Sequence, residues 1–252
     1  MSSIVSAFND AFSEKLSFLK IAIYAIPVFF CIKFFMAGKM IEFNILSYIT
    51  SCLLYALMTV GINNVRENNR EILTLNPLKL LIVYLKSLVV TIPQGILWGG
   101  IGFAATTFCA TTIPDEITVL VFSIIIWVIV GTICFTAYLS FAKYLDIRDG
   151  YNFQIIFSSC FDILAAIIFY IPQIIIAAAV VIGPFAYAFW LLHVPFDHWF
   201  FIVLCSLAIV ANVSITANYF AQISYEYIVT SDDRRDDYQI TKLVDEMDVN
   251  KN

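Results

Sequence analysis

The chain has 252 residues, of which 61% are hydrophobic and 13% are charged, and its formal net charge is −5. A soluble domain has about 25% charged residues, so this composition excludes an ordinary soluble protein. Nothing in the sequence resembles the basic face of a nucleic-acid-binding protein, so we expect membrane lipids and no nucleic acid as partners.

Six long apolar segments follow one another along the chain. A helix rises 1.5 Å per residue and the hydrocarbon layer is about 30 Å thick, so a span takes about 20 residues. The expected spans are residues 17–36, 44–64, 80–109, 117–142, 161–182 and 199–225. The predicted fold class is therefore all-α: a polytopic membrane helix bundle with six transmembrane helices in three tandem hairpins.

Two details of these spans are specific expectations. The first span is predicted to be a retained helix and not a cleaved signal, because Asp10 and Glu14 interrupt the basic segment before it. Gly183-Pro184 is predicted to end the fifth helix, which leaves residues 185–196 as an outer interfacial segment. Residues 1–230 then form one integral membrane domain, followed by an acidic cytoplasmic tail over residues 231–252.

The distribution of basic residues predicts the orientation. With six spans, all of the 14 Lys and Arg except Lys33 and Lys39 fall on the same side of the membrane. Cytoplasmic loops carry an excess of Lys and Arg, so both termini are expected on the cytoplasmic side. The expected location is the cell (inner) membrane. Lys33 is expected to extend along the outer end of the first span toward the interface.

A threefold internal repeat is predicted from the odd-numbered spans. The segments FLKIAIYAIPVFF, YLKSLVVTIPQGI and FDILAAIIFYIPQII each place Ile-Pro inside a helix, at Pro27, Pro93 and Pro172. These prolines either only shape the bundle or kink three helices around a cavity, with Gln94 and Gln173 beside it. Chance is the alternative to the repeat, because Ile and Phe are abundant and membrane helices tolerate Pro.

Each copy of the repeat is expected to begin with an amphipathic helix at the cytoplasmic interface. Ile4, Phe8, Phe12 and Leu16 recur every four residues, and a similar apolar spacing runs over residues 153–160. Residues 72–78 carry a weaker version of this pattern.

Few polar side chains fall at membrane depth, and these are the candidate site residues. His193 and Asp197 are four residues apart in the outer segment, where they either pair or are simply solvated. Asn212 is expected to share one face of the last span with Asn218 and Gln222, as an interhelical hydrogen-bonding face. The six cysteines are scattered singly, as small packing residues are, and form no metal-binding or redox motif.

Catalytic motifs are absent from the sequence. It contains no G-x-S-x-G, H-E-x-x-H, Walker A or dinucleotide-binding pattern, and it has only two histidines. We therefore expect a protein that is not an enzyme and that carries no metal or other cofactor.

The acidic tail has one patterned stretch. Ile240, Leu243, Val244 and Met247 follow the spacing of an amphipathic helix. Such a helix would bind a protein partner or the chain's own cytoplasmic loops, and a frayed end is the alternative. The pattern does not predict an oligomeric state.

A family resemblance covers most of the chain. The stretch FAKYLDIRDGYNFQIIFSSCFDILAAIIFYIPQII (141–175), followed by ANYFAQISYEY (217–227), resembles an uncharacterised prokaryotic multi-pass membrane family, domain of unknown function 4013. VRENNREILTLNP (65–77) is similar to the polar linker of that family. The resemblance implies the same order of helices, and it implies no functional residues because the function of the family is unknown.

These observations predict a non-enzymatic membrane protein that binds lipid or a partner protein. The alternative is a small transporter or channel-like permease with kinked helices around a central cavity, which would need a polar path through the bundle. A lipid-modifying enzyme is a third possibility, and it would need clustered acids or histidines at one interface.

Overall fold

The computed structural model describes residues 4–13, 16–66, 73–191, 195 and 198–228. Within these residues the fold is entirely helical, with no strand, which confirms the predicted all-α class. The helices are α1 Ile4–Ala11, α2 Ser17–Met36, α3 Met40–Arg66, α4 Pro77–Thr112, α5 Glu116–Tyr144, the 3-10 helix η1 Asp149–Tyr151, α6 Phe153–Leu191 and α7 Trp199–Tyr227.

Six of these helices, α2 to α7, are long and apolar enough to cross a membrane. Their most apolar 18-residue windows have a mean hydropathy between 1.8 and 2.7, with no more than two charged residues each. The chain is therefore a multi-pass membrane protein with six candidate spans, as the sequence predicts.

Local sequence explains where two of the long helices begin. Asn76 precedes α4, and its side chain accepts hydrogen bonds from the backbone amides of Leu78 and Lys79, both at 3.1 Å. Pro77 occupies the first helical position, where its missing amide is not needed. Asp115 caps α5 in the same way, because its carboxylate accepts from the amide of Thr118 at 2.8 Å.

The predicted break at Gly183-Pro184 is wrong. Helix α6 runs without interruption from Phe153 to Leu191 and contains both Pro172 and Pro184. A proline removes one backbone hydrogen bond, and a long apolar helix tolerates that loss. The segment predicted to be interfacial therefore begins as part of α6.

The interfacial helices also differ from the expectation. Within the described residues, only the first is a separate helix, α1, which packs Ala7 and Ala11 against the rest of the protein. Residues 153–160 are instead the first turns of α6, with Ile156 and Cys160 buried. Leu75 and Leu78 lie on either side of the start of α4 and are exposed.

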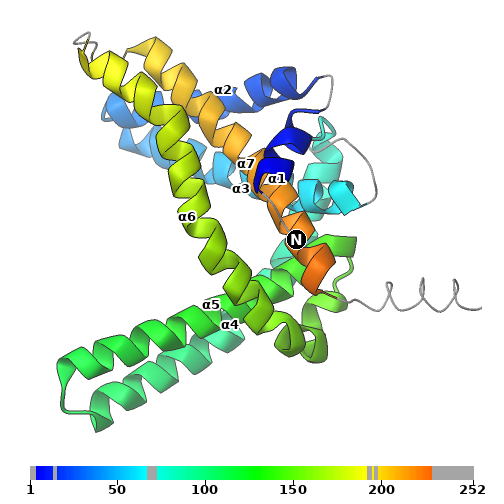
Figure 1. Cartoon of the computed structure of the whole chain (residues 1–252), viewed down its shortest axis with the longest axis vertical. Coiled ribbons are helices and arrows are strands. Elements are labelled where there is room, and N and C mark those ends of the chain that lie inside the picture. The colour runs from blue at the N-terminus through cyan, green and yellow to red at the C-terminus, as the bar shows by residue number, and fades with distance from the viewer. Residues whose placement is uncertain (1–3, 14–15, 67–72, 192–194, 196–197, 229–252) are drawn as a thin grey trace, which may run out of the picture.

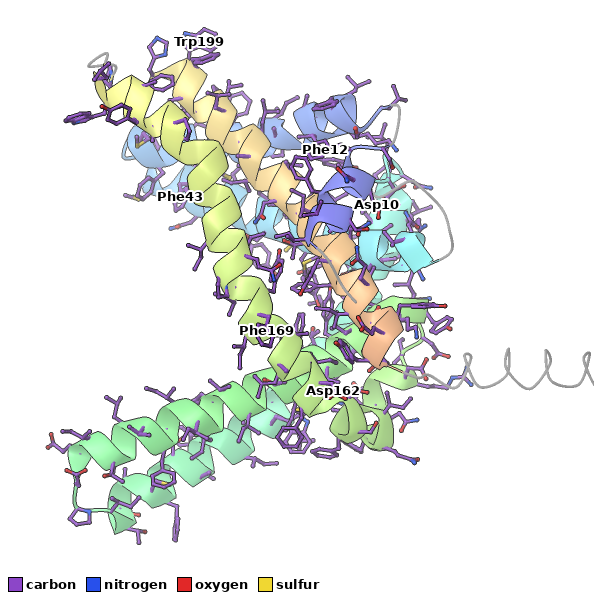
Figure 2. The ribbon with its side chains drawn as sticks, viewed as in Figure 1. Asp10, Phe12, Phe43, Asp162, Phe169 and Trp199 are labelled. Carbon is purple, nitrogen blue, oxygen red and sulfur yellow. The ribbon has the colours of Figure 1, made fainter. Side chains whose placement is uncertain are left out.

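The helices do not form one closed bundle. Figure 1 shows the α4–α5 hairpin extending away from the other helices, while α6 crosses from the base of this hairpin to the opposite end of the molecule. In Figure 2, Asp162 lies near the start of α6, and Trp199 lies far from it at the start of α7. An acidic side chain and a tryptophan thus mark opposite ends of this helix pair.

The two halves of α5 have different surroundings. Every residue from 136 to 143 is buried, and four of these eight residues (Tyr138, Leu139, Phe141 and Ala142) belong to a core shared with α3, α6 and α7. The first half of α5 carries large exposed apolar side chains, such as Ile117 and Leu120. In a membrane protein such side chains face lipid, so the protein-packed core lies at the end of α5 near Tyr144.

Candidate functional site

Two regions bring polar side chains together at the buried end of α5. We call the first the α5–α7 junction, formed by Asn63, Gln94, Lys143, Gly150 and Ile228. Lys143 is only 2% exposed, and its Nζ donates to the carbonyl oxygen of Ile228 at 2.6 Å, just beyond the end of α7. The Nδ2 of Asn63 donates to the carbonyl oxygen of Lys143 at 3.1 Å. These bonds join α3, α5 and α7.

Gln94 supplies a second link of the junction. Its Nε2 donates to the carbonyl oxygen of Gly150 at 2.9 Å, and its Oε1 accepts from Nε1 of Trp98 at 2.8 Å. Gly150 has no room for a side chain, because a Cβ atom there would lie 2.6 Å from Cγ1 of Val90. Since its polar side chains bond to the protein itself, we interpret the junction as a structural element.

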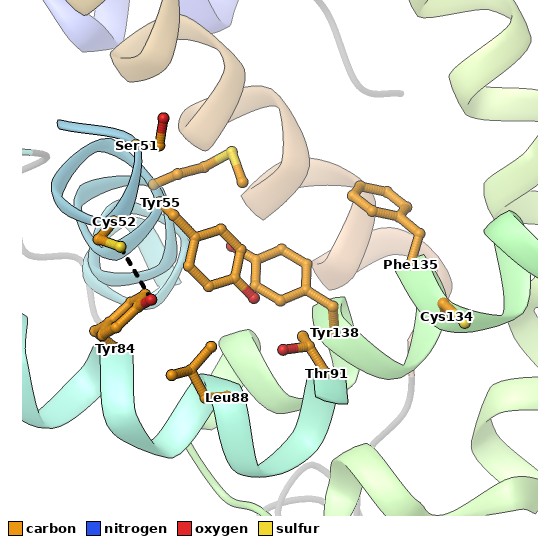
Figure 3. A pocket seen from close by; sticks show the side chains of 10 residues that line it. Ser51, Cys52, Tyr55, Tyr84, Leu88, Thr91, Cys134, Phe135 and Tyr138 are labelled. Atoms are coloured by element: carbon orange, nitrogen blue, oxygen red, sulfur yellow. Dashed lines mark hydrogen bonds between the residues drawn. The ribbon is translucent and has the colours of Figure 1, made fainter. Parts of the chain in front are cut away.

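The second region is a groove between α3, α4 and α5, which we call the tyrosine groove. It has a volume of about 500 Å³ and is shown in Figure 3. The lining residues are Ser51, Cys52, Tyr55, Met58, Tyr84, Leu88, Thr91, Cys134, Phe135 and Tyr138. None of them carries a charge at neutral pH, so the groove suits an uncharged, largely apolar ligand.

Three tyrosine rings form one wall of the groove. The rings of Tyr55 and Tyr138 stack with their centroids 5.3 Å apart, and Tyr84 meets Tyr55 edge-to-face at 6.3 Å. Such pairs have the separations and orientations that aromatic rings prefer. Phe135 extends the wall toward α7, where its ring packs against Phe220 at 4.9 Å. The wall is therefore fixed by contacts among α3, α4, α5 and α7.

The hydroxyl groups of the three tyrosines are paired differently. Tyr138 shares a hydrogen bond of 2.9 Å with the hydroxyl of Thr59, and Tyr84 accepts one of 3.0 Å from the thiol of Cys52. The Tyr55 hydroxyl is buried and has no hydrogen-bond partner among the described residues. Since a buried hydroxyl is usually hydrogen-bonded, this group is the chemically distinctive one in the groove.

The prolines and glutamines of the predicted cavity lie outside this groove. Pro27, Pro93 and Pro172 are inside helices α2, α4 and α6, and none of them lines the groove. Gln94 is buried in the junction, whereas Gln173 is exposed on α6. The two Ile-Pro-Gln motifs therefore have different environments, and the threefold repeat stays a prediction.

The remaining candidate residues do not gather at one place. Lys33 is exposed in the last turn of α2, with its Nζ 5.8 Å from the centre of the Phe29 ring. Asn212 is exposed, but Asn218 is buried and accepts from Nε2 of Gln222 at 2.7 Å. The expected shared face is wrong for Asn212, because six residues turn a helix by about 240°.

The candidate pair His193 and Asp197 lies outside the described residues. Within those residues, no group of three His, Cys, Asp or Glu side chains is arranged to hold a metal ion. The expectations about cofactors and catalysis stay predictions.

The sequence did not single out the groove residues as a site. A signal was present for Tyr55, which lies in the middle of the predicted span 44–64, but not for Tyr84 and Tyr138, which lie four residues from the ends of the predicted spans 80–109 and 117–142. Tyrosines that anchor a helix at the membrane surface sit near the ends of spans. A tyrosine away from those ends needs a polar partner within the protein or from a ligand.

Comparison with known proteins found no matching family model, no matching characterised protein and no matching solved structure. The resemblance to domain of unknown function 4013 therefore stays a prediction.

Proposed function

We propose that this membrane protein binds the apolar chain of a lipid in the tyrosine groove, and that it does so without catalysing a reaction. The observation that carries the proposal is an uncharged aromatic groove of about 500 Å³ between candidate spans. Ligand sites in proteins typically measure about 300–1,000 Å³ and are mostly apolar with a few polar groups.

The depth of the groove supports a lipid ligand. Tyr138 lies six residues before Tyr144, the last residue of α5, which corresponds to about 9 Å along the helix. Tyr55 lies near the middle of α3. The groove therefore occupies the half of the hydrocarbon layer nearer Lys143, where lipid chains are the most abundant molecules.

The orientation belongs to the same proposal. If the basic side of the protein faces the cytoplasm, both termini are cytoplasmic and the groove opens within the cytoplasmic leaflet of the cell membrane. A protein partner for the acidic tail would then approach from that side.

A permease is less well supported than a lipid-binding protein. A path for a water-soluble solute needs polar groups from one end of the bundle to the other. The polar groups that line the tyrosine groove are hydroxyls and thiols only.

Native mass spectrometry of the purified protein tests the proposal. The wild-type protein is expected to retain a lipid, and Thr91→Phe is expected to lose it because the new ring fills the groove. Val89→Phe is the matched control: it adds the same bulk to the opposite, exposed face of α4. Equal retention by both variants would show that the lipid binds elsewhere, and solute flux through vesicles without a retained lipid would favour the permease.

A further inference from the structure

The Tyr55 hydroxyl is an unpaired polar group in an otherwise apolar groove. In Figure 3 it points from α3 toward α4, between Leu88 and Thr91. The nearby hydroxyls of Ser87 and Thr91 donate to carbonyls of their own helix, at 2.7 and 2.9 Å. The Tyr55 hydroxyl lies near both of these hydroxyls, but it forms no hydrogen bond of normal geometry with them or with any other described residue. Burying such a group without a partner is unfavourable, so a ligand that supplies a partner gains affinity.

The charge of the lining restricts what that ligand can be. Among the residues that the structure describes, no lysine, arginine, aspartate or glutamate lines the groove. A charged headgroup brought to this depth would therefore lose its hydration without gaining an ion pair. A pure hydrocarbon would leave the Tyr55 hydroxyl unpaired.

We infer that the groove selects an uncharged lipid that has a hydroxyl or carbonyl oxygen, and that the Tyr55 hydroxyl binds this oxygen. The inference rests on the proposed function, because it concerns the polar end of a lipid whose chain lies in the same groove. The ligand oxygen reaches Tyr55 after a change of rotamer at Leu88, a flexible side chain that lines the groove beside it.

The test compares three probes of equal chain length: monoolein, which is uncharged and has ester and hydroxyl oxygens, oleate, which is charged, and octadecene, which has no oxygen. Their affinities for the full-length protein in detergent are measured by native mass spectrometry. Wild-type protein is expected to bind monoolein more tightly than either of the other two probes.

Tyr55→Phe removes only the hydroxyl and is expected to weaken monoolein binding about fivefold, the effect of one hydrogen bond. Octadecene binding is expected to stay unchanged. Tyr187→Phe is the matched control, because Tyr187 is exposed on α6 and does not line the groove.

Two results would overturn this inference while leaving lipid binding intact. One is equal monoolein affinity in wild type and Tyr55→Phe, and the other is oleate binding as tight as monoolein binding. Failure of the wild-type protein to retain any of the three probes would instead overturn the proposed function, and this inference with it.

Discussion

The α5–α7 junction and the tyrosine groove lie next to each other at the buried end of α5, but their polar side chains are paired differently. In the junction, Asn63, Gln94 and Lys143 each donate a hydrogen bond to a backbone carbonyl. In the groove, the Tyr55 hydroxyl is buried and has no hydrogen-bond partner of normal geometry in the described part of the chain. The comparison teaches that, at this end of α5, the paired side chains of the junction join helices, whereas the unpaired Tyr55 hydroxyl belongs to a residue that lines the groove.

The comparison also separates stability from binding. Changes in the junction should lower the stability of the fold, because they remove or displace bonds that join helices. Removing the unpaired Tyr55 hydroxyl of the groove should alter ligand binding with little loss of stability.

Gly150→Ala should produce the largest loss of stability. The new Cβ would lie 2.6 Å from Cγ1 of Val90, which is completely buried and has little room to move aside. Overpacking of this kind costs about 2–3 kcal/mol. Gly131→Ala is the matched control, since a Cβ at Gly131 meets nothing within 4 Å. Thermal unfolding in detergent measures both, and equal stabilities of the two variants would contradict the tight packing of the junction.

Lys143→Met should lower the stability of the fold somewhat less than Gly150→Ala does. The substitution keeps an apolar side chain of similar length but leaves the carbonyl of Ile228 without its donor. An unsatisfied buried acceptor costs about 1–3 kcal/mol, and we expect roughly 2 kcal/mol here. The exposed Lys33 in α2 provides the control: Lys33→Met should change the unfolding free energy by less than about 0.5 kcal/mol. A Lys143→Met protein as stable as wild type would show that the bond is dispensable.

Two tyrosine variants test the comparison within the groove. Tyr138→Phe removes a hydroxyl that is bonded to Thr59, so the stability should fall by about 1 kcal/mol. Tyr55→Phe removes an unpaired hydroxyl, so in the absence of ligand the stability should stay the same or rise by up to about 1 kcal/mol. The comparison fails if both variants lose the same stability in chemical unfolding.

The smallest effect concerns pH at the start of α5. Bonds from the hydroxyl and the backbone amide of Thr118 lower the pKa of Asp115 below its ordinary value of 3.8. The cap therefore stabilises the helix fully above pH 3.8, and this contribution is lost as the pH falls through the lower pKa of the folded state. Protection of the Thr118 amide from hydrogen exchange should decrease below that pH. Asp115→Asn should show no such decrease, because an asparagine cap does not titrate.

Much of the fold could be predicted from the sequence because membrane spans are long and apolar. Asn76-Pro77 and Asp115 also have the residue types expected where helices begin. The continuity of α6 through Pro184 could not be predicted, since the same Gly-Pro pair ends helices in other settings.

The site was harder to predict than the fold. Gln94 and Gln173 follow the same Ile-Pro pair, yet one is buried and the other is exposed, because their surroundings come from other helices. The groove depends on tyrosines from three helices that are up to 83 residues apart in the chain. Periodicity within one helix does not predict which of its polar groups will find a partner on another.

Photochemical cross-linking tests the central claim most directly. The protein is reconstituted into vesicles containing a monoacylglycerol with a diazirine in its acyl chain, and the modified residues are mapped by mass spectrometry. The account predicts adducts on groove residues such as Met58, Leu88 and Phe135, which Thr91→Phe abolishes while adducts on the exposed Ile125 persist. Adducts only at outward-facing positions such as Ile125, unchanged in Thr91→Phe, would contradict lipid binding in the groove.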